Sequence, residues 1–147
     1  MLGAVSAFLL HELAHKLVAQ HYGMWAEFRL DHTGIMMSLL TAIPFLPFKL
    51  LAPGRMVIIG YKGTQDKMGN VAMAGILTNL GLAVTFIAIA SWYPLLFYAA
   101  ILNADLAFFN LLPFSVLDGR RIFSWNRRIW LVLFGATVIL WLYLWAT

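Results

Sequence analysis

The sequence predicts an all-α polytopic membrane protein with about four transmembrane helices and a small β-hairpin or sheet between the first and the second. Of its 147 residues, 63% are hydrophobic and 11% are charged, and the mean hydropathy is +0.85. A soluble domain of this size exposes too much of its surface to hide so many apolar side chains. Four apolar stretches and a one-sided distribution of basic residues agree with this. We therefore expect a single membrane-embedded core over residues 1–147, without an appended soluble domain.

Four apolar stretches supply the predicted transmembrane helices. They cover residues 1–21, 70–91, 95–112 and 129–146. Each is close to the ~20 residues that cross about 30 Å of hydrocarbon in a helix. Pro94 suits the first turn of the third helix, and Pro113 cannot continue it.

The segment between the first two helices has a different pattern. Apolar and charged residues alternate over 26–31, and β-branched residues are frequent over 55–61, so both stretches are predicted strands. Between them, residues 34–51 form an apolar run that is interrupted by Pro44 and Pro47. We interpret this run as a re-entrant or interfacial segment.

The basic residues predict the orientation of the chain in the membrane. All except Lys16 lie between the first and second helices or between the third and fourth: Arg29, Lys49, Arg55, Lys62, Lys67, Arg120, Arg121, Arg127 and Arg128. These two loops share one side of the membrane, which the positive-inside tendency identifies as cytoplasmic, and we expect this membrane to be the cell membrane. The basic run at 120–128 is then explained by orientation, and we expect no nucleic-acid partner.

The first helix carries the segment HELAH at its centre. His11 and His15 are four residues apart and project from one face, where both can reach a single ion, and Glu12 lies beside them. Ionisable groups at this depth, roughly 15 Å from the end of the helix, are costly in a bilayer unless something offsets them. A zinc site explains the cluster, and the alternative is a polar cluster that only holds helices together.

A catalytic zinc usually has three protein ligands, so a third is expected elsewhere. Cysteine is absent, which leaves His, Asp and Glu as ligands. The candidates are Asp105, Asp118, His21, His32, Glu27, Asp31 and Asp66. Asp118 is favoured, because the third helix has ended at Pro113 and Gly119 permits a sharp turn back toward the interior.

Three segments resemble the signature sequences of the site-2 protease family of intramembrane zinc metalloproteases. They are HELAHK at 11–16, AGILTN at 74–79 and FNLLPFSVLDG at 109–119. They occur in the order found in that family, and the resemblance extends over most of the chain.

The resemblance implies one Zn²⁺ per chain, held by His11, His15 and Asp118, with Glu12 as the catalytic glutamate. Asn79 matches a motif asparagine near the active site, which implies a contact to substrate or to the developing oxyanion. A hydrogen bond between helices is an equally good interpretation of Asn79. Asp105 is interpreted first as a protonated or paired structural group, then as a water-path residue or a ligand.

The expected function is therefore regulated intramembrane proteolysis of transmembrane protein substrates. Glu12 would take a proton from a zinc-bound water and pass it to the leaving amine, while one of the strands receives the unwound substrate. A catalytically silent, metal-binding membrane protein of the same fold is the alternative. A transporter is disfavoured, because the second and fourth apolar stretches carry almost no ionisable residues.

Overall fold

The computed structural model describes the whole chain except residues 1, 31, 33–34, 37–53, 60–63 and 115–116. Its elements are α1 (Leu2–His21), β1 (Trp25–Leu30), β2 (Gly54–Ile59), α3 (Gln65–Ile89), α4 (Leu95–Leu111), α5 (Asp118–Trp125) and α6 (Arg127–Ala146). The predicted mostly helical fold with a small sheet after the first helix is confirmed. The predicted re-entrant segment at 34–51 lies, apart from Ile35 and Met36, outside the described residues.

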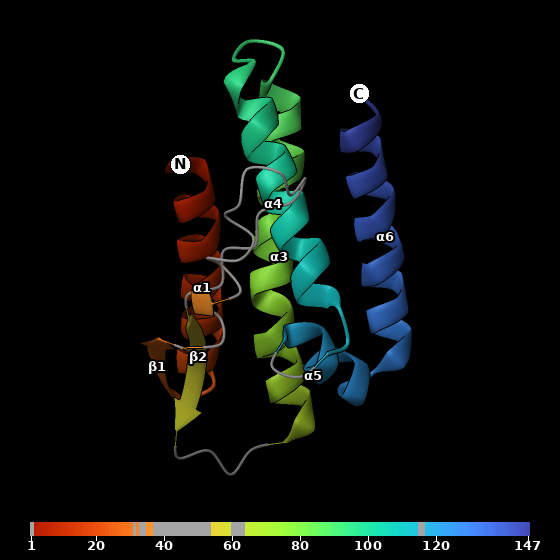
Figure 1. Cartoon of the computed structure of the whole chain (residues 1–147). Coiled ribbons are helices and arrows are strands. Elements are labelled where there is room, and N and C mark those ends of the chain that lie inside the picture. The colour runs from red at the N-terminus through yellow and green to blue at the C-terminus, as the bar shows by residue number, and fades with distance from the viewer. Residues whose placement is uncertain (1, 31, 33–34, 37–53, 60–63, 115–116) are drawn as a thin grey trace.

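The long helices form a bundle in which α3 and α4 are central, with α1 on one side and α6 on the other (Figure 1). A short turn joins α3 to α4, with Pro94 at the start of α4 as predicted. Small buried residues, Ala83, Ala100 and Ala104, lie in the core cluster near this turn. These small side chains let the helix backbones approach closely. Helices in a membrane often pack in this way, because moving apolar surface out of lipid gains little free energy.

Three of the four predicted apolar helices begin and end within about two residues of the predicted limits. The exception is α3, which begins at Gln65 rather than at residue 70, so part of the predicted polar loop is helical. Thr64 has an extended backbone directly before this helix, and Asp66 lies in its first turn, where a negative charge is favourable. α6 begins after Asn126, whose side-chain oxygen accepts hydrogen bonds from two backbone N–H groups of the first turn.

Helix α5 was not predicted, because eight residues rich in arginine have no long apolar period. Tertiary contacts hold it against the start of α3. The Trp125 indole N–H donates to Asp66 Oδ1 over 2.7 Å, and the same indole lies directly over Gly69, where any side chain would collide with it. The segment after α4 therefore folds back on the bundle at a defined place.

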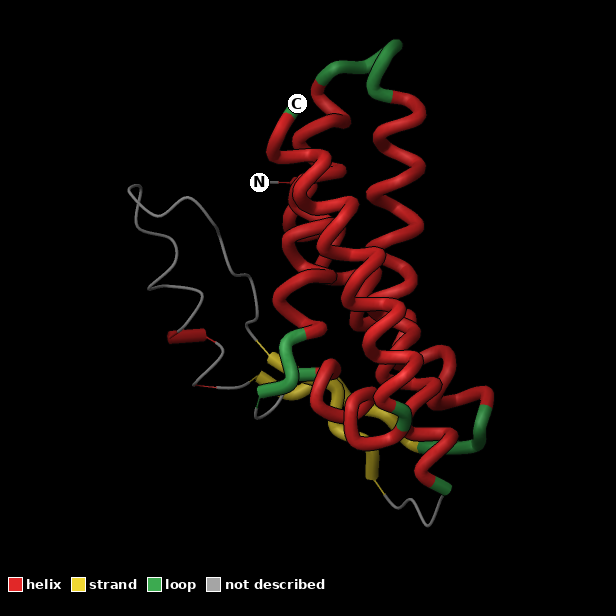
Figure 2. The backbone as a smooth tube through the Cα atoms, turned by 90° about the vertical axis from the view of Figure 1, so that its right-hand side faces the viewer, coloured by secondary structure: helices red, strands yellow, loops and turns green. Residues whose placement is uncertain are grey.

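The two strands pair antiparallel, with Trp25 opposite Ile59 and Leu30 opposite Gly54. Their limits are within two residues of those predicted. Gly23, with φ of 73°, makes the turn between α1 and β1, a conformation that glycine adopts at little cost. Figure 2 shows the sheet at the same end of the bundle as α5.

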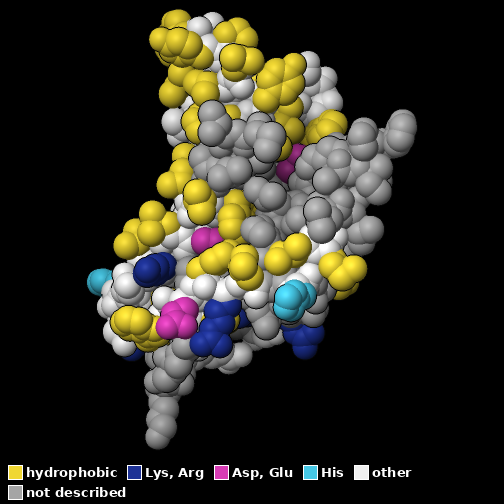
Figure 3. Space-filling model, turned by 60° about the vertical axis from the view of Figure 1, so that its left-hand side comes forward, with side chains coloured by type: hydrophobic (Ala, Val, Ile, Leu, Met, Phe, Trp, Pro, Cys, Tyr) yellow, Lys and Arg dark blue, Asp and Glu magenta, His cyan; other side chains and the backbone are white. Residues whose placement is uncertain are grey.

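Two of the described helices, α3 and α6, are long and apolar enough to cross a membrane, and α4 is a shorter apolar helix. This supports a membrane location for the chain, whereas crossing by all four predicted spans remains a prediction. Hydrophobic side chains dominate one end of the face in Figure 3, and the Lys and Arg side chains on this face gather toward the other end. That second end carries the sheet and α5 (Figure 1).

Candidate metal centre

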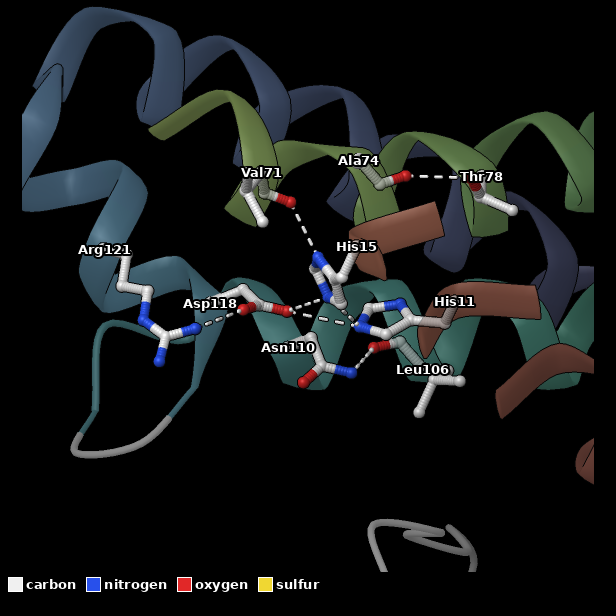
Figure 4. Close-up of polar contacts among 9 residues, drawn as sticks. All are labelled: His11, His15, Val71, Ala74, Thr78, Leu106, Asn110, Asp118 and Arg121. Atoms are coloured by element: carbon white, nitrogen blue, oxygen red, sulfur yellow. Dashed lines mark hydrogen bonds and ion pairs between the residues drawn. The ribbon is translucent and has the colours of Figure 1, made fainter. Parts of the chain in front are cut away.

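Three buried side chains from two distant segments meet between α1, α3 and α5 (Figure 4). His11 and His15 come from α1, and Asp118 is the first residue of α5. One ligand atom from each lies within 4.8 Å of the other two. The structure thus brings together the three residues that were predicted as ligands, across a sequence separation of 107 residues between His11 and Asp118.

The distances between these atoms fit a tetrahedral zinc ion. Asp118 Oδ2 lies 3.2 Å from His11 Nε2 and 2.9 Å from His15 Nε2, and the two Nε2 atoms are 3.0 Å apart. Bond lengths of about 2.1 Å at tetrahedral angles place neighbouring ligand atoms about 3.4 Å apart, so the observed separations are within about half an ångström of those around a zinc ion. Two imidazole nitrogens and a carboxylate oxygen are also ligand types that zinc accepts, so the residues present fit this metal.

Helix α3 fixes the orientation of the histidines. His15 Nδ1 donates a hydrogen bond to the carbonyl oxygen of Val71 over 2.6 Å, which leaves the Nε2 lone pair directed at the cluster. Gly75 lies against both rings: a Cβ there would be 2.5 Å from His15 Nε2 and 2.7 Å from His11 Nε2. A residue without a side chain is therefore required where α3 passes the cluster.

The turn after α4 brings Asp118 to the histidines. Gly119 packs so closely on the Leu111 carbonyl that a side chain would not fit, and the Leu111 oxygen accepts a hydrogen bond from the Trp130 indole over 2.8 Å. Burial raises the pKa of the Asp118 carboxyl, but the charges and hydrogen bonds of the two histidines together outweigh burial and hold this pKa well below its usual range. Asp118 is therefore a carboxylate, the form that binds metal.

The other two predicted site residues lie on the same helices. Glu12 follows His11 on α1 and is half-buried. Asn79 lies one turn beyond Gly75 on α3 and is 0% exposed. Neither polar atom of its amide has a hydrogen-bond partner among the described residues, so the predicted alternative, a hydrogen bond between helices, is not seen in this part of the chain.

The other candidates for the third ligand do not join the cluster, as far as the described residues reach; these are Glu27, His21, His32, Asp66 and Asp105. Asp105 instead accepts hydrogen bonds from Trp141 and Trp145 of α6, which agrees with its first interpretation as a paired structural group. Asp31 lies outside the described residues.

Sequence reasoning missed three contributors to this centre: the Val71 carbonyl, Gly75 and Arg121. Gly75 had a signal, since a glycine inside an apolar helix often marks a close approach. Arg121, whose Nη1 lies 3.4 Å from Asp118 Oδ1, becomes visible only when residues 118–125 are known to be helical. A backbone carbonyl has no signal in the side-chain sequence.

A helical chain of membrane-like composition, in which an HExxH helix and a distant aspartate form a buried group that could hold a metal ion, has the general design of a metalloprotease. It is 37% identical over 134 residues to the "Putative zinc metalloprotease MJ0611" of Methanocaldococcus jannaschii, and the match covers 86% of this chain and 70% of that protein. The chain belongs to the family of this protein. No protein-family model and no solved structure matches the chain.

Proposed function

We propose that this protein is an intramembrane zinc metalloprotease that hydrolyses peptide bonds within or near the transmembrane segments of other proteins. The observation that carries the proposal is the buried set of His11, His15 and Asp118, whose ligand atoms lie close enough together to share one zinc ion. Membership in the family of a protein named as a zinc metalloprotease supports both the metal and the reaction class.

Each polar residue of the centre has a role in this proposal. Bound zinc would polarise the scissile carbonyl and acidify the attacking water. Glu12, next to His11 on α1, takes a proton from that water and delivers it to the leaving amine. Val71 and Gly75 keep the histidines in place, so that the active groups need not reorganise during the reaction.

The proposed membrane setting adds α1 and α4 to the two helices that are long and apolar enough to span. The turn between α3 and α4 lies at one end of the bundle, and the sheet and α5 lie at the other (Figure 1). We assign the second end to the cytoplasm, because the basic loops of the sequence fall there. His11 and His15 are then within reach of a membrane-embedded substrate.

Asn79 is proposed as a contact for substrate or for the developing oxyanion. A buried amide whose donor and acceptor both lack protein partners costs free energy unless something else binds it. Its position one turn from Gly75, which touches both histidines, puts it at about 6 Å along α3 from that contact.

The substrate is proposed to add to the sheet as an extended strand. A helical peptide bond is shielded, so a transmembrane substrate must unwind before it is cut. Among the described residues, β1 pairs with β2 along one edge only, and its other edge can supply main-chain hydrogen bonds to a peptide. Proline substitutions along this edge of β1 should impair cleavage and leave the zinc content unchanged; equal loss of both would argue against the proposal.

The decisive experiment compares the wild type with Glu12→Gln in two measurements, the bound zinc and the cleavage of a transmembrane reporter. We expect one zinc per chain in both proteins, with cleavage by the wild type alone. Chelation should abolish cleavage by the wild type, and added zinc should restore it. If both proteins bind zinc and neither cuts any membrane substrate, the catalytically silent alternative is favoured.

A further inference from the structure

The two carboxylate oxygens of Asp118 have different partners (Figure 4). Oδ2 faces the Nε2 atoms of both histidines. Oδ1 is 3.4 Å from Nη1 of Arg121, three residues further along α5. The side chain of Asp118 is 9% exposed and that of Arg121 is 41% exposed, so the arginine reaches from the surface to a buried carboxylate.

Helix geometry explains why this arginine, and not its neighbour, makes the contact. Residues three apart lie on the same face of a helix, whereas adjacent residues point in different directions. Arg120 is exposed, and within the described part of the chain its side chain makes no hydrogen bond or ion pair. The chain thus carries two adjacent arginines of equal charge, of which one contacts the proposed metal ligand.

We propose that Arg121 is a positioning residue that orients Asp118 so that a single oxygen, Oδ2, is presented to the metal. Without this contact, the carboxylate could rotate and exchange its oxygens, and Oδ1 would lose its charged partner in a buried place. Hydrogen bonds to the ligands of a metal commonly fix their orientation, and their loss typically weakens metal binding about 10–100-fold. The inference rests on the zinc site of the proposed function.

A second effect of Arg121 opposes the first. A guanidinium group is always charged, and it repels a bound cation. The carboxylate of Asp118 lies between the guanidinium and the two histidines (Figure 4), which reduces this repulsion. The sign of the change in zinc affinity therefore decides between orientation and repulsion as the main effect of the arginine.

The test measures zinc affinity in detergent by competition with a chromogenic chelator. It compares the 147-residue chain with its variants Arg121→Gln, Arg121→Lys and Arg120→Gln. We expect zinc binding to be about 10–100-fold weaker in Arg121→Gln and partly restored in Arg121→Lys. Arg120→Gln, the matched control for loss of charge, should stay within about twofold of the wild type. The visible absorption of bound Co²⁺ should change in Arg121→Gln, change less in Arg121→Lys and stay the same in Arg120→Gln, because only substitutions of Arg121 alter how Asp118 meets the metal.

Three results would overturn the inference while the zinc site stands: unchanged affinity in Arg121→Gln, tighter binding in Arg121→Gln, or equal weakening in Arg120→Gln. If Arg121→Gln does not fold, the comparison of Arg121→Lys with Arg120→Gln tests the inference. Arg121→Lys should bind zinc less tightly than the wild type, and Arg120→Gln should bind it equally well. A wild type that binds no zinc would instead refute the proposed function, and the inference with it.

Discussion

Two buried aspartates lie thirteen residues apart, one within α4 and the other at the start of α5, and they have different surroundings. Asp118 is 7% exposed and faces two histidines of α1. Asp105 is 5% exposed, and its Oδ1 accepts hydrogen bonds from the indoles of Trp141, over 2.7 Å, and Trp145, over 3.3 Å. Burial is nearly equal, so burial does not distinguish a metal ligand from a structural carboxylate.

The groups that face each carboxylate make the difference. Imidazole nitrogens can share a cation with a carboxylate, whereas an indole N–H is only a hydrogen-bond donor. Asp105 therefore joins α4 to α6, while Asp118 joins α5 to α1 through the centre. An acidic residue in an apolar helix is a candidate functional residue. The groups that contact it from neighbouring helices indicate whether it binds a metal or pairs with a structural partner.

The largest effect expected from this comparison is on zinc binding. Asp118→Ala removes one of the three proposed ligands and should weaken zinc binding by more than about 100-fold, since even the loss of an outer contact costs 10–100-fold. Asp105→Asn removes the other buried carboxyl group and should keep one zinc per chain. Metal analysis after gel filtration measures both. Loss of zinc from both variants would mean that the two aspartates are not separate in function.

The sequence predicted which three side chains lie together better than it predicted the residues that hold them in place. His11 and His15 share a helix, so their spacing alone shows that they can meet one ion. Asp118 was favoured from its place after Pro113 and from the family motif. By contrast, the packing of Gly75 against the histidines depends on the register between α1 and α3, which no local pattern encodes.

The packing of Gly75 of α3 against the histidines of α1 supplies the second prediction. In Gly75→Ala, the new methyl group would lie within 2.7 Å of nitrogens of both histidines, so the rings must move and zinc binding should weaken about 10–100-fold. Gly81→Ala is the matched control on the same helix, because a Cβ there meets nothing within 4 Å. It should bind zinc as the wild type does and gain up to about 1 kcal/mol from the higher helix propensity of alanine.

Titration with zinc and thermal unfolding in detergent measure these two effects separately. Equal zinc affinity in Gly75→Ala and Gly81→Ala would show that α3 does not press on the histidines. A stable Gly75→Ala protein with weak zinc binding would place the defect at the centre rather than in the fold.

Local sequence patterns do not encode contacts between distant segments, which also explains why α5 and the partners of Asp105 were not predicted. Residues 118–125 form a helix because Trp125 is held by Asp66 and packs on Gly69, and both partners are more than fifty residues away in the sequence. Asp105 in isolation was compatible with a ligand, a water path or a structural pair. Only the packing of α6 on α4 decides among these interpretations.

The smallest predicted effect concerns that packing. Trp141→Phe keeps an aromatic ring beside Phe108, on which the indole stacks with centroids 5.0 Å apart, but it removes the N–H donor to Asp105. Trp145 still donates to the same oxygen. Hydrogen bonds between helices in membranes are worth about 1 kcal/mol, so the melting temperature should fall by roughly 2–4 °C and zinc affinity should not change.

Trp92→Phe is the control for this substitution, because Trp92 is 74% exposed in the turn between α3 and α4 and the structure gives its indole no hydrogen bond to a described residue. An equal fall in melting temperature for both variants would refute a specific role of the indole N–H. A fall in zinc affinity in Trp141→Phe would show that α6 supports the metal centre through α4, and the two aspartates would then belong to one coupled unit.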